Sequence, residues 1–372
     1  MTAFAHRVAP SDTSGRILPG PMTRTLALAG GVACLAALAA AWVAPEDAIH
    51  AWIGAAFFWT SLPIGGLLLL MMMRLIPGIW SNEAMVVMEA ASVLVPLAAL
   101  VFVPVLLGLG AAYPWVGETQ NTAFRQIYLS PGFFVARTVL WFVLLGALTA
   151  LLIVRRPWSM PLACLGLVLF PLGGTVIVTD WLMTLDPEFR SSGFGLYAMS
   201  IQAAIAMAAG TATALAISGA MIRKPAVLGG LLLTVLLLWA YFAYMQYVVI
   251  WSSDFPKLID WYKVRGTGIW RIMLWSFAIV HTAAIALLIL PPVLRRRRLL
   301  IGIALAVLAG KMLEVAWIVL PAGKYGPGML AIGLFVLANA GLGAIFIVAA
   351  SVAIQARIAA RVPKRRPGGG HG

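Results

Sequence analysis

Long apolar stretches follow one another along almost the whole chain, separated by short polar or basic connections. A helix needs about 20 apolar residues to cross a bilayer, and windows of that length predict ten membrane-spanning helices. The predicted spans cover residues 24–44, 50–73, 84–108, 132–154, 160–184, 194–221, 225–252, 270–292, 298–320 and 327–355. Strands of a membrane barrel would instead alternate apolar and polar residues over about ten positions. The pattern therefore predicts an all-α integral membrane protein.

The spans divide the chain into a tail over residues 1–23, a membrane domain over 24–355 and a basic tail over 356–372. The first span has an alternative interpretation. Arg24, a short apolar core and the small residues Ala39–Ala41 also fit a cleaved signal peptide. We expect the span to be retained, because the charge pattern of the loops is better satisfied with it present.

Composition agrees with this class and narrows the chemistry. Of the 372 residues, 62% are hydrophobic and 10% are charged, with a mean hydropathy of +0.99, whereas soluble domains have about 45–50% apolar and about 25% charged residues. The two cysteines, Cys34 and Cys164, are too few for a cysteine-ligated iron–sulfur cluster or a disulfide framework. The sequence has no CxxCH motif, and of its four histidines only His281 lies in an apolar run. We therefore expect no metal site and no covalently bound cofactor, and keep a bound quinone or quinol as an open alternative.

The net charge of +14 is distributed unevenly over the connections. One alternate set is strongly basic and contains Arg7, Arg16, Arg24, Arg74, Arg155, Arg156, Arg223, Lys224, Arg295, Arg296, Arg297, Arg298, Arg357, Arg361, Lys364, Arg365 and Arg366. The opposite set contains Arg125, Arg190, Lys257, Lys263, Arg265, Arg271 and Lys324. The positive-inside rule predicts that the first set and both termini are cytoplasmic. The basic excess then serves topology and attraction to the lipid bilayer, and we expect no binding of nucleic acid.

Three connections on the predicted outer side are comparatively long, at about 109–131, 185–193 and 253–269. They are rich in aromatic and charged residues. Loops of this kind favour contact with a partner or substrate on that side, although an ordinary aromatic belt at the membrane interface is the alternative.

Six ionisable residues fall inside the predicted spans, where each costs about 2.5–3.5 kcal/mol on insertion scales and is rarely accidental. They are Glu89, Arg137, Asp180, His281, Lys311 and Glu314. Lys311 and Glu314 are three residues apart, so they share a helix face and can pair. Arg137 is a plausible partner for Asp180, and Glu89 has no obvious local partner.

Groups at graded depths are what a proton relay requires. The hypothetical path consists of Glu89, His281, Lys311, Glu314 and Asp180 together with Tyr241, Tyr244 and Tyr247 on the seventh span. The structural alternative is that the charges are buried ion pairs that hold the helices together. A quinol site is a further possibility, with Arg137, Trp181 and Gln246 as quinone-binding or structural residues, although the tyrosines could equally be interfacial anchors.

Several polar motifs resemble one family. They are DWLMTLDPEFRSSGFGLY (Asp180 to Tyr197), WAYFAYMQYVVIWSSDFPKLIDWYKVRGTGIW (Trp239 to Trp270), KMLEVAWIVLP (Lys311 to Pro321), and FFWTSLPIGGL with Trp80 and Glu89 downstream. In order and spacing they resemble the NrfD-like membrane subunits of alternative complex III, a quinol:cytochrome c oxidoreductase. The similarity is closest to the second quinone-type subunit, which is related to the polysulfide-reductase anchor.

The resemblance implies two four-helix bundles, over about 50–184 and 194–320, flanked by the first and last spans. It implies a bacterial inner-membrane complex with a sister NrfD-like subunit, an iron–sulfur subunit and multihaem cytochromes. Such a complex oxidises quinol, and this kind of subunit is thought to contribute a proton path without a redox centre of its own.

This chain departs from the family pattern at several positions. Glu188 stands where the family has His, and Lys257 and Leu258 replace a pair of glutamates. Met85 and Val86 occupy the place of an expected Arg, while Lys311 and Glu314 replace His and Asp. The intramembrane carboxylates are kept, which favours proton handling or structure over an intact quinol site.

Two rivals remain at this point. One is a purely structural membrane anchor. The other is a secondary transporter, since Pro63, Pro104 and Pro171 interrupt spans as in broken transporter helices, although no inverted repeat is visible.

Overall fold

The structure is a computed structural model, and it describes residues 20–118, 122–154, 159–218, 224–253, 256–322 and 329–361. Most of the two predicted tails lie outside these ranges. So do several basic residues used for the predicted orientation, namely Arg7, Arg16, Arg155, Arg156, Arg223, Lys324, Lys364, Arg365 and Arg366.

Every regular element of the described residues is helical, which confirms the all-α class. The long helices are α2 (Gly20–Ala39), α3 (Pro45–Leu75), α4 (Ile79–Ser92), α5 (Val95–Leu107), α8 (Pro131–Val154), α9 (Ser159–Leu182), α10 (Phe194–Ser218), α11 (Pro225–Ser253), α13 (Gly268–Leu288), α15 (Arg297–Val319) and α16 (Met329–Ala359). The short elements are η1 (Ala40–Trp42), α6 (Leu109–Ala112), α7 (Ala123–Tyr128), η3 (Met183–Leu185), α12 (Pro256–Arg265), α14 (Pro291–Leu294) and η5 (Leu320–Ala322). In this part of the chain nine helices are long and apolar enough to cross a membrane, or ten if α4 and α5 form one span.

The third predicted span is not one continuous helix, as the hydropathy pattern had suggested. It starts earlier, at Ile79, and divides into α4 and α5, which meet at an angle of 42°. Pro96 lies in the first turn of α5, where its missing N–H is tolerated. In an unbroken helix its ring would clash with the carbonyl of Ser92, four residues earlier. The break therefore falls between Ser92 and Val95.

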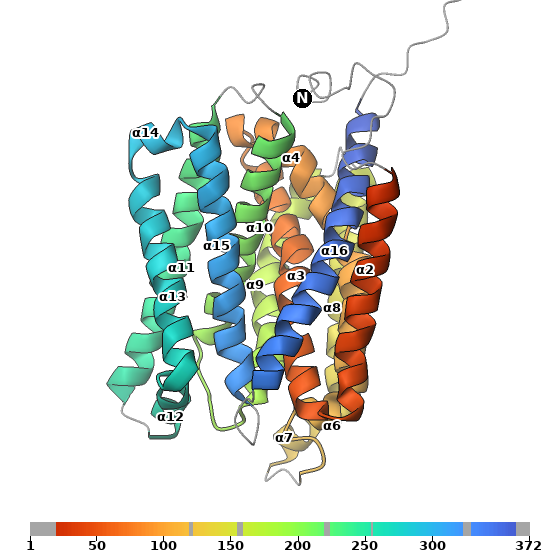
Figure 1. Ribbon diagram of the computed structural model, residues 1–372, viewed down its shortest axis with the longest axis vertical. Helices are drawn as coiled ribbons and strands as arrows, with labels where there is room; N and C mark the ends of the chain where they lie inside the picture. The colour runs from red at the N-terminus through yellow and green to blue at the C-terminus, as the bar shows by residue number, and fades with distance from the viewer. Residues whose placement is uncertain are drawn as a thin grey trace, which may run out of the picture.

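The spans form two groups around two central helices (Figure 1). In the first group, α3 contacts α4, α5 and α9, and α8 packs on α5 and α9. In the second, α10 packs on α11 and α15, and α13 packs on both of these. The groups meet where α3 contacts α10, and these two helices are the most buried of the membrane-spanning set. This is the expected pair of bundles.

The first and last spans pack side by side against this assembly, as α2 and α16 in Figure 1. Two glycines allow their close approach. A Cβ atom at Gly30 would lie 2.8 Å from the carbonyl oxygen of Gly341, and one at Gly341 would lie 2.8 Å from the Sγ atom of Cys34. Small residues at such contacts are typical of helix pairs in membranes.

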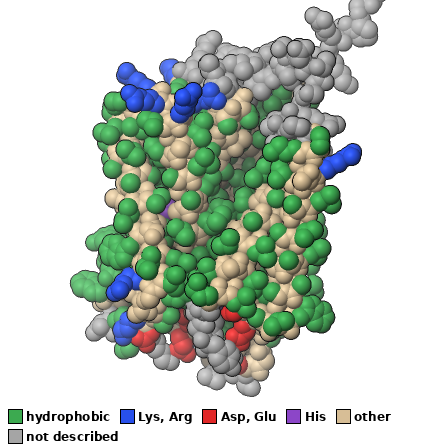
Figure 2. Space-filling model, viewed as in Figure 1, with side chains coloured by type: hydrophobic (Ala, Val, Ile, Leu, Met, Phe, Trp, Pro, Cys, Tyr) green, Lys and Arg blue, Asp and Glu red, His purple; other side chains and the backbone are tan. Residues whose placement is uncertain are grey.

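On the face that Figure 2 shows, the outer surface of the helices is apolar over most of its height. Exposed apolar residues such as Leu140, Val168 and Ile279 lie on several of the long helices, as expected for a lipid-facing surface. Lys and Arg side chains gather at the end where α2 begins and α16 ends, here called the terminal end. The opposite end carries α6, α7 and α12 and is here called the α12 end (Figure 1).

Candidate functional site

A fully buried carboxylate, that of Glu314, organises the second bundle. The Nζ atom of Lys311 lies 2.7 Å from its Oε2 atom, which confirms the predicted pair. Its Oε1 atom accepts hydrogen bonds from the hydroxyl of Tyr197 and, at 2.8 Å, from the indole N–H of Trp239. Three helices, α10, α11 and α15, therefore supply donors to one carboxylate, and charge-assisted bonds of this kind are the strong ones.

The same indole contacts two further members of the site. The ammonium of Lys311 lies 3.5 Å from the centre of the Trp239 ring, close enough for a cation–π interaction. The ring of His281, on α13, lies 4.5 Å from that of Trp239. Tyr197, Trp239, His281, Lys311 and Glu314 together form what we call the central cluster.

His281 is the least satisfied member of the central cluster. It is completely buried, and neither imidazole nitrogen makes a well-formed hydrogen bond with the described residues, although the carbonyl of Val307 lies nearby. Gly310 lets the ring approach α15, since a Cβ atom there would lie 2.9 Å from Nε2 of His281. A buried polar group without partners is unusual and costly, so this ring is a candidate for function.

The predicted pair of Arg137 and Asp180 is also confirmed, and it joins α8 to α9 near the α12 end. The guanidinium is bidentate, with Nε 2.6 Å from Oδ2 and Nη2 3.1 Å from Oδ1. Arg137 also donates to the carbonyl of Tyr128 and lies 4.1 Å from the centre of its ring. The Tyr128 hydroxyl in turn bonds Asp180.

Burial, together with the charge and the hydrogen bond of Asp180, raises the pKa of Tyr128 to about 12. Burial likewise raises the pKa of Tyr113, whose hydroxyl donates to the carbonyl of Trp181. Both phenols are therefore neutral donors at physiological pH.

Trp181 has a packing role in the structure. Its N–H donates to the hydroxyl of Thr138, and its ring packs against Phe102 and Phe142. A cavity of about 340 Å³ lies beside this region, lined among others by Trp115, Tyr128 and Arg190. Thr179, which precedes Asp180 in the chain, also lines it.

No partner for Glu89 is obvious in the sequence, and the structure gives it three. Its carboxylate lies 2.7 Å from Nη2 of Arg74, 2.9 Å from Nη2 of Arg357 and 2.8 Å from Nη2 of Arg361. Arg74 lies in the last turn of α3 and Arg357 in the last turn of α16, while Arg361 lies two residues beyond α16. Arg357 and Arg361 are 268 residues or more from Glu89 along the chain. We call these four residues the arginine cluster, and it lies near the terminal end.

The tyrosines of the seventh span are not brought to the buried groups. Tyr241, Tyr244 and Tyr247 are 56%, 66% and 49% exposed, so they lie on the outer face of α11. Gln246 is on the buried face, where its side-chain oxygen accepts a hydrogen bond of 2.7 Å from Ser191.

Sequence reasoning from charges alone did not select Tyr197, Trp239 or Arg265. Arg265 is buried at the end of α12, donates to the carbonyls of Trp261 and Ile318, and stacks on the Trp261 ring. Burial lowers its pKa to about 9, which leaves it a cation at neutral pH. A signal for the other two was present in the motifs: one ends at Tyr197, the next begins at Trp239 and the third begins at Lys311. All three therefore meet at the central cluster.

The fold and these sites define a multi-pass helical membrane protein with ionisable side chains buried between its helices. A scan of protein-family models finds none that matches the chain, and a search of curated proteins finds no relative. Within the described ranges, no group of three or more His, Cys, Asp or Glu residues could hold a metal ion.

Proposed function

We propose that the chain is an integral subunit of a quinol-oxidising respiratory complex in a bacterial inner membrane, and that it carries a proton path. The observation that supports this best is the central cluster. It places a carboxylate, an ammonium group, a phenol and an imidazole within one buried site. The polar motifs that resemble the NrfD-like subunits converge on the same site.

The central cluster has the groups that a proton-transfer step needs. Glu314 can take up or release a proton, and the nearby Lys311 ammonium compensates its charge when the proton is absent. A neutral imidazole accepts a proton at one nitrogen and donates one from the other, and both nitrogens of His281 lack well-formed partners. Water molecules in polar cavities would complete such a path.

The orientation in this proposal has the terminal end facing the cytoplasm, because the basic side chains gather there. The α12 end would then meet the electron-transfer partners: an iron–sulfur subunit, multihaem cytochromes and a sister NrfD-like subunit. It exposes large apolar side chains, including Phe124, Ile127 and Trp251. A bound quinone would fit best in the cavity beside Tyr128 and Asp180, which has both aromatic and polar lining.

A purely structural anchor is the second candidate, and the ion pairs away from the central cluster favour it. Asp180 is held by a bidentate guanidinium, and Glu89 has three guanidinium partners. Carboxylates paired in this way join α8 to α9 and α16 to α3 and α4, and they need no other role.

The first experiment is gentle purification from native membranes followed by haem spectroscopy. Co-purifying multihaem cytochromes support the respiratory assignment, whereas a colourless protein without partners contradicts it.

The second experiment compares Glu314→Gln with the control Asp260→Asn. Asp260 is an exposed carboxylate on α12 that pairs with Lys263. In vesicles containing the purified complex, a proton path through Glu314 predicts fewer protons translocated per quinol oxidised for the first variant only. Equal translocation in the wild type and Glu314→Gln would leave the structural anchor as the better function.

A further inference from the structure

We propose that the protein binds an anionic phospholipid, with the phosphate at the arginine cluster and an acyl chain in the groove that leads to it. This lipid site does not depend on the respiratory role.

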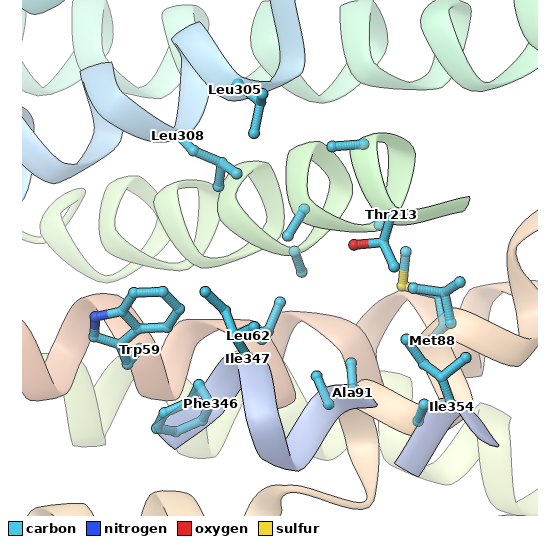
Figure 3. A pocket seen from close by; sticks show the side chains of 17 residues that line it. Trp59, Leu62, Met88, Ala91, Thr213, Leu305, Leu308, Phe346, Ile347 and Ile354 are labelled. Atoms are coloured by element: carbon cyan, nitrogen blue, oxygen red, sulfur yellow. The ribbon is translucent and has the colours of Figure 1, made fainter. Parts of the chain in front are cut away.

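The groove has a volume of about 310 Å³ and lies between the two bundles and α16 (Figure 3). It is bounded by side chains of α3, α4, α10, α15 and α16, which are almost all apolar. The N–H of Trp59 already donates to the carbonyl of Asn339, so that ring presents carbon atoms to the space. Its size falls in the range of ligand pockets, and its lining suits a hydrocarbon chain.

One end of the groove is lined by residues that neighbour the arginine cluster along α4 and α16. Figure 3 shows Trp59 and Phe346 at one end of the groove and Met88 and Ile354 at the other. On α16, Arg357 follows Ile354 by three residues, so the two share one helix face; Arg361 lies two residues beyond the end of that helix. On α4, Ala90 and Ala91 line the groove directly after Glu89. The lining of the groove is therefore separated from Glu89 and Arg357 by one residue and by one helical turn, respectively.

The arginine cluster has a net positive charge. Three guanidinium groups surround the single carboxylate of Glu89. Counting the buried Glu83 of the same helix, which has contacts of its own, still leaves the cations in excess.

Hydrogen-bond donors are also in excess. Three guanidinium groups carry about fifteen N–H donors, whereas the two carboxylates of Glu89 and Glu83 together offer about eight acceptor positions. The Nη2 atom of Arg361, a side chain only 10% exposed, lies near Glu89 without a well-formed hydrogen bond to any described residue. A phosphate supplies both the missing charge and the missing acceptors, because guanidinium groups bind phosphate oxygens in a bidentate manner.

The apolar groove and the excess of positive charge together fit an anionic lipid better than they fit other occupants. A soluble phosphate would leave the apolar groove unfilled. A neutral quinone or an apolar helix of a partner would fill the groove but leave the charge unmatched. Basic pockets between membrane helices are known binding sites for anionic lipid headgroups.

The test uses the full-length protein in nanodiscs that contain equal amounts of phosphatidylglycerol and phosphatidylcholine, with the retained lipid identified by native mass spectrometry. The wild type should retain phosphatidylglycerol in preference to phosphatidylcholine. Arg361→Gln should weaken this retention about tenfold, since about 1.4 kcal/mol, the scale of one charged hydrogen bond, corresponds to a factor of ten. Arg298→Gln, which removes an exposed arginine at the terminal end away from the groove, should leave retention unchanged.

A second pair of variants tests the groove. Ala350→Leu places a larger side chain in the groove and should reduce phosphatidylglycerol retention, while Val352→Leu enlarges an exposed residue of the same helix and should not. Thermal unfolding of each variant in phosphatidylcholine alone checks that it is folded.

Four outcomes would overturn the proposal. They are no preference for phosphatidylglycerol in the wild type, equal losses in Arg361→Gln and Arg298→Gln, displacement of the lipid by millimolar inorganic phosphate alone, and retention of a neutral quinone in place of phosphatidylglycerol.

Discussion

The ammonium of Lys311 lies 3.5 Å from the centre of the Trp239 ring. The N–H of this ring donates to Glu314, the ion-pair partner of Lys311. One indole from α11 thus contacts both charges of α15, so the pair is positioned by a neighbouring helix as well as by its own. This arrangement makes the stability of the second bundle sensitive to each partner separately.

Neutralising one charge of this pair should cost more than neutralising both. Removing one member of a buried pair leaves the other charge uncompensated, which typically costs about 3–5 kcal/mol. We expect Lys311→Met and Glu314→Gln each to lower the free energy of unfolding in mixed micelles by about that amount. The double variant should lose less than the sum, which a double-mutant cycle measures directly. Additive losses would show that the two side chains do not interact in the folded protein.

Trp239→Phe tests the contribution of the indole N–H separately from that of the aromatic ring. The variant keeps an aromatic face for Lys311 but removes the donor to Oε1 of Glu314, and a buried acceptor that loses its partner costs about 1–3 kcal/mol. Its unfolding free energy should therefore fall by about this amount. Tyr244→Phe is the control, because that phenol is 66% exposed and should tolerate the change.

Tyr128 gives a prediction about pH. Its pKa is raised to about 12 by burial and by Asp180, so the folded protein holds the phenolic proton more tightly than the unfolded chain, where the pKa is about 10. The stabilisation is therefore fully present below about pH 10 and is lost as the pH rises through the folded-state value. An alkaline absorbance titration of the wild type minus that of Tyr128→Phe should show a phenol that ionises near pH 12. A difference signal centred near pH 10 would contradict the burial of this group.

The spans were predictable because a run of about 20 consecutive apolar residues has the length of a helix that crosses a bilayer. The break at Pro96 was missed because a hydropathy window averages over a proline that is itself apolar. Lys311 and Glu314 were predictable from their spacing, and Arg137 and Asp180 from their similar depth. Two of the partners of Glu89, Arg357 and Arg361, were not, because they approach it only once α16 packs against the first bundle.

The orientation of α11 shows a different limit. Spacing by three residues places Tyr241, Tyr244 and Tyr247 on one face of a helix, but the helix is apolar on all sides. In a soluble protein the polar face would point to water. In a membrane both the lipid and the bundle interior are apolar, so the pattern does not indicate which face is buried.

Close packing of the first and last spans should depend on Gly341 of α16 and not on Gly31 of α2. A Cβ atom at Gly341 would lie 2.9 Å from the backbone nitrogen of Cys34 and 3.0 Å from the carbonyl oxygen of Gly30. Backbone atoms in helices cannot move aside cheaply, and overpacking typically costs about 1–3 kcal/mol. Gly341→Ala should therefore lower the melting temperature and expose Cys34 to thiol reagents. Gly31→Ala, which meets nothing within 4 Å, should change neither.

The position of His281 can be tested without altering any ionisable residue. A Cβ atom at Gly310 would lie 2.9 Å from Nε2 and 3.1 Å from Cε1 of His281, so Gly310→Ala should displace the imidazole while Lys311, Glu314 and Trp239 keep their chemistry. If His281 takes part in proton transfer, this variant should reduce proton translocation by the purified complex at least tenfold more than it reduces quinol oxidation without a proton gradient. Gly302→Ala on the same helix, where the added Cβ meets nothing within 4 Å, is the matched control. Unchanged translocation in a folded Gly310→Ala complex would show that His281 fills space against α15 and carries no protons.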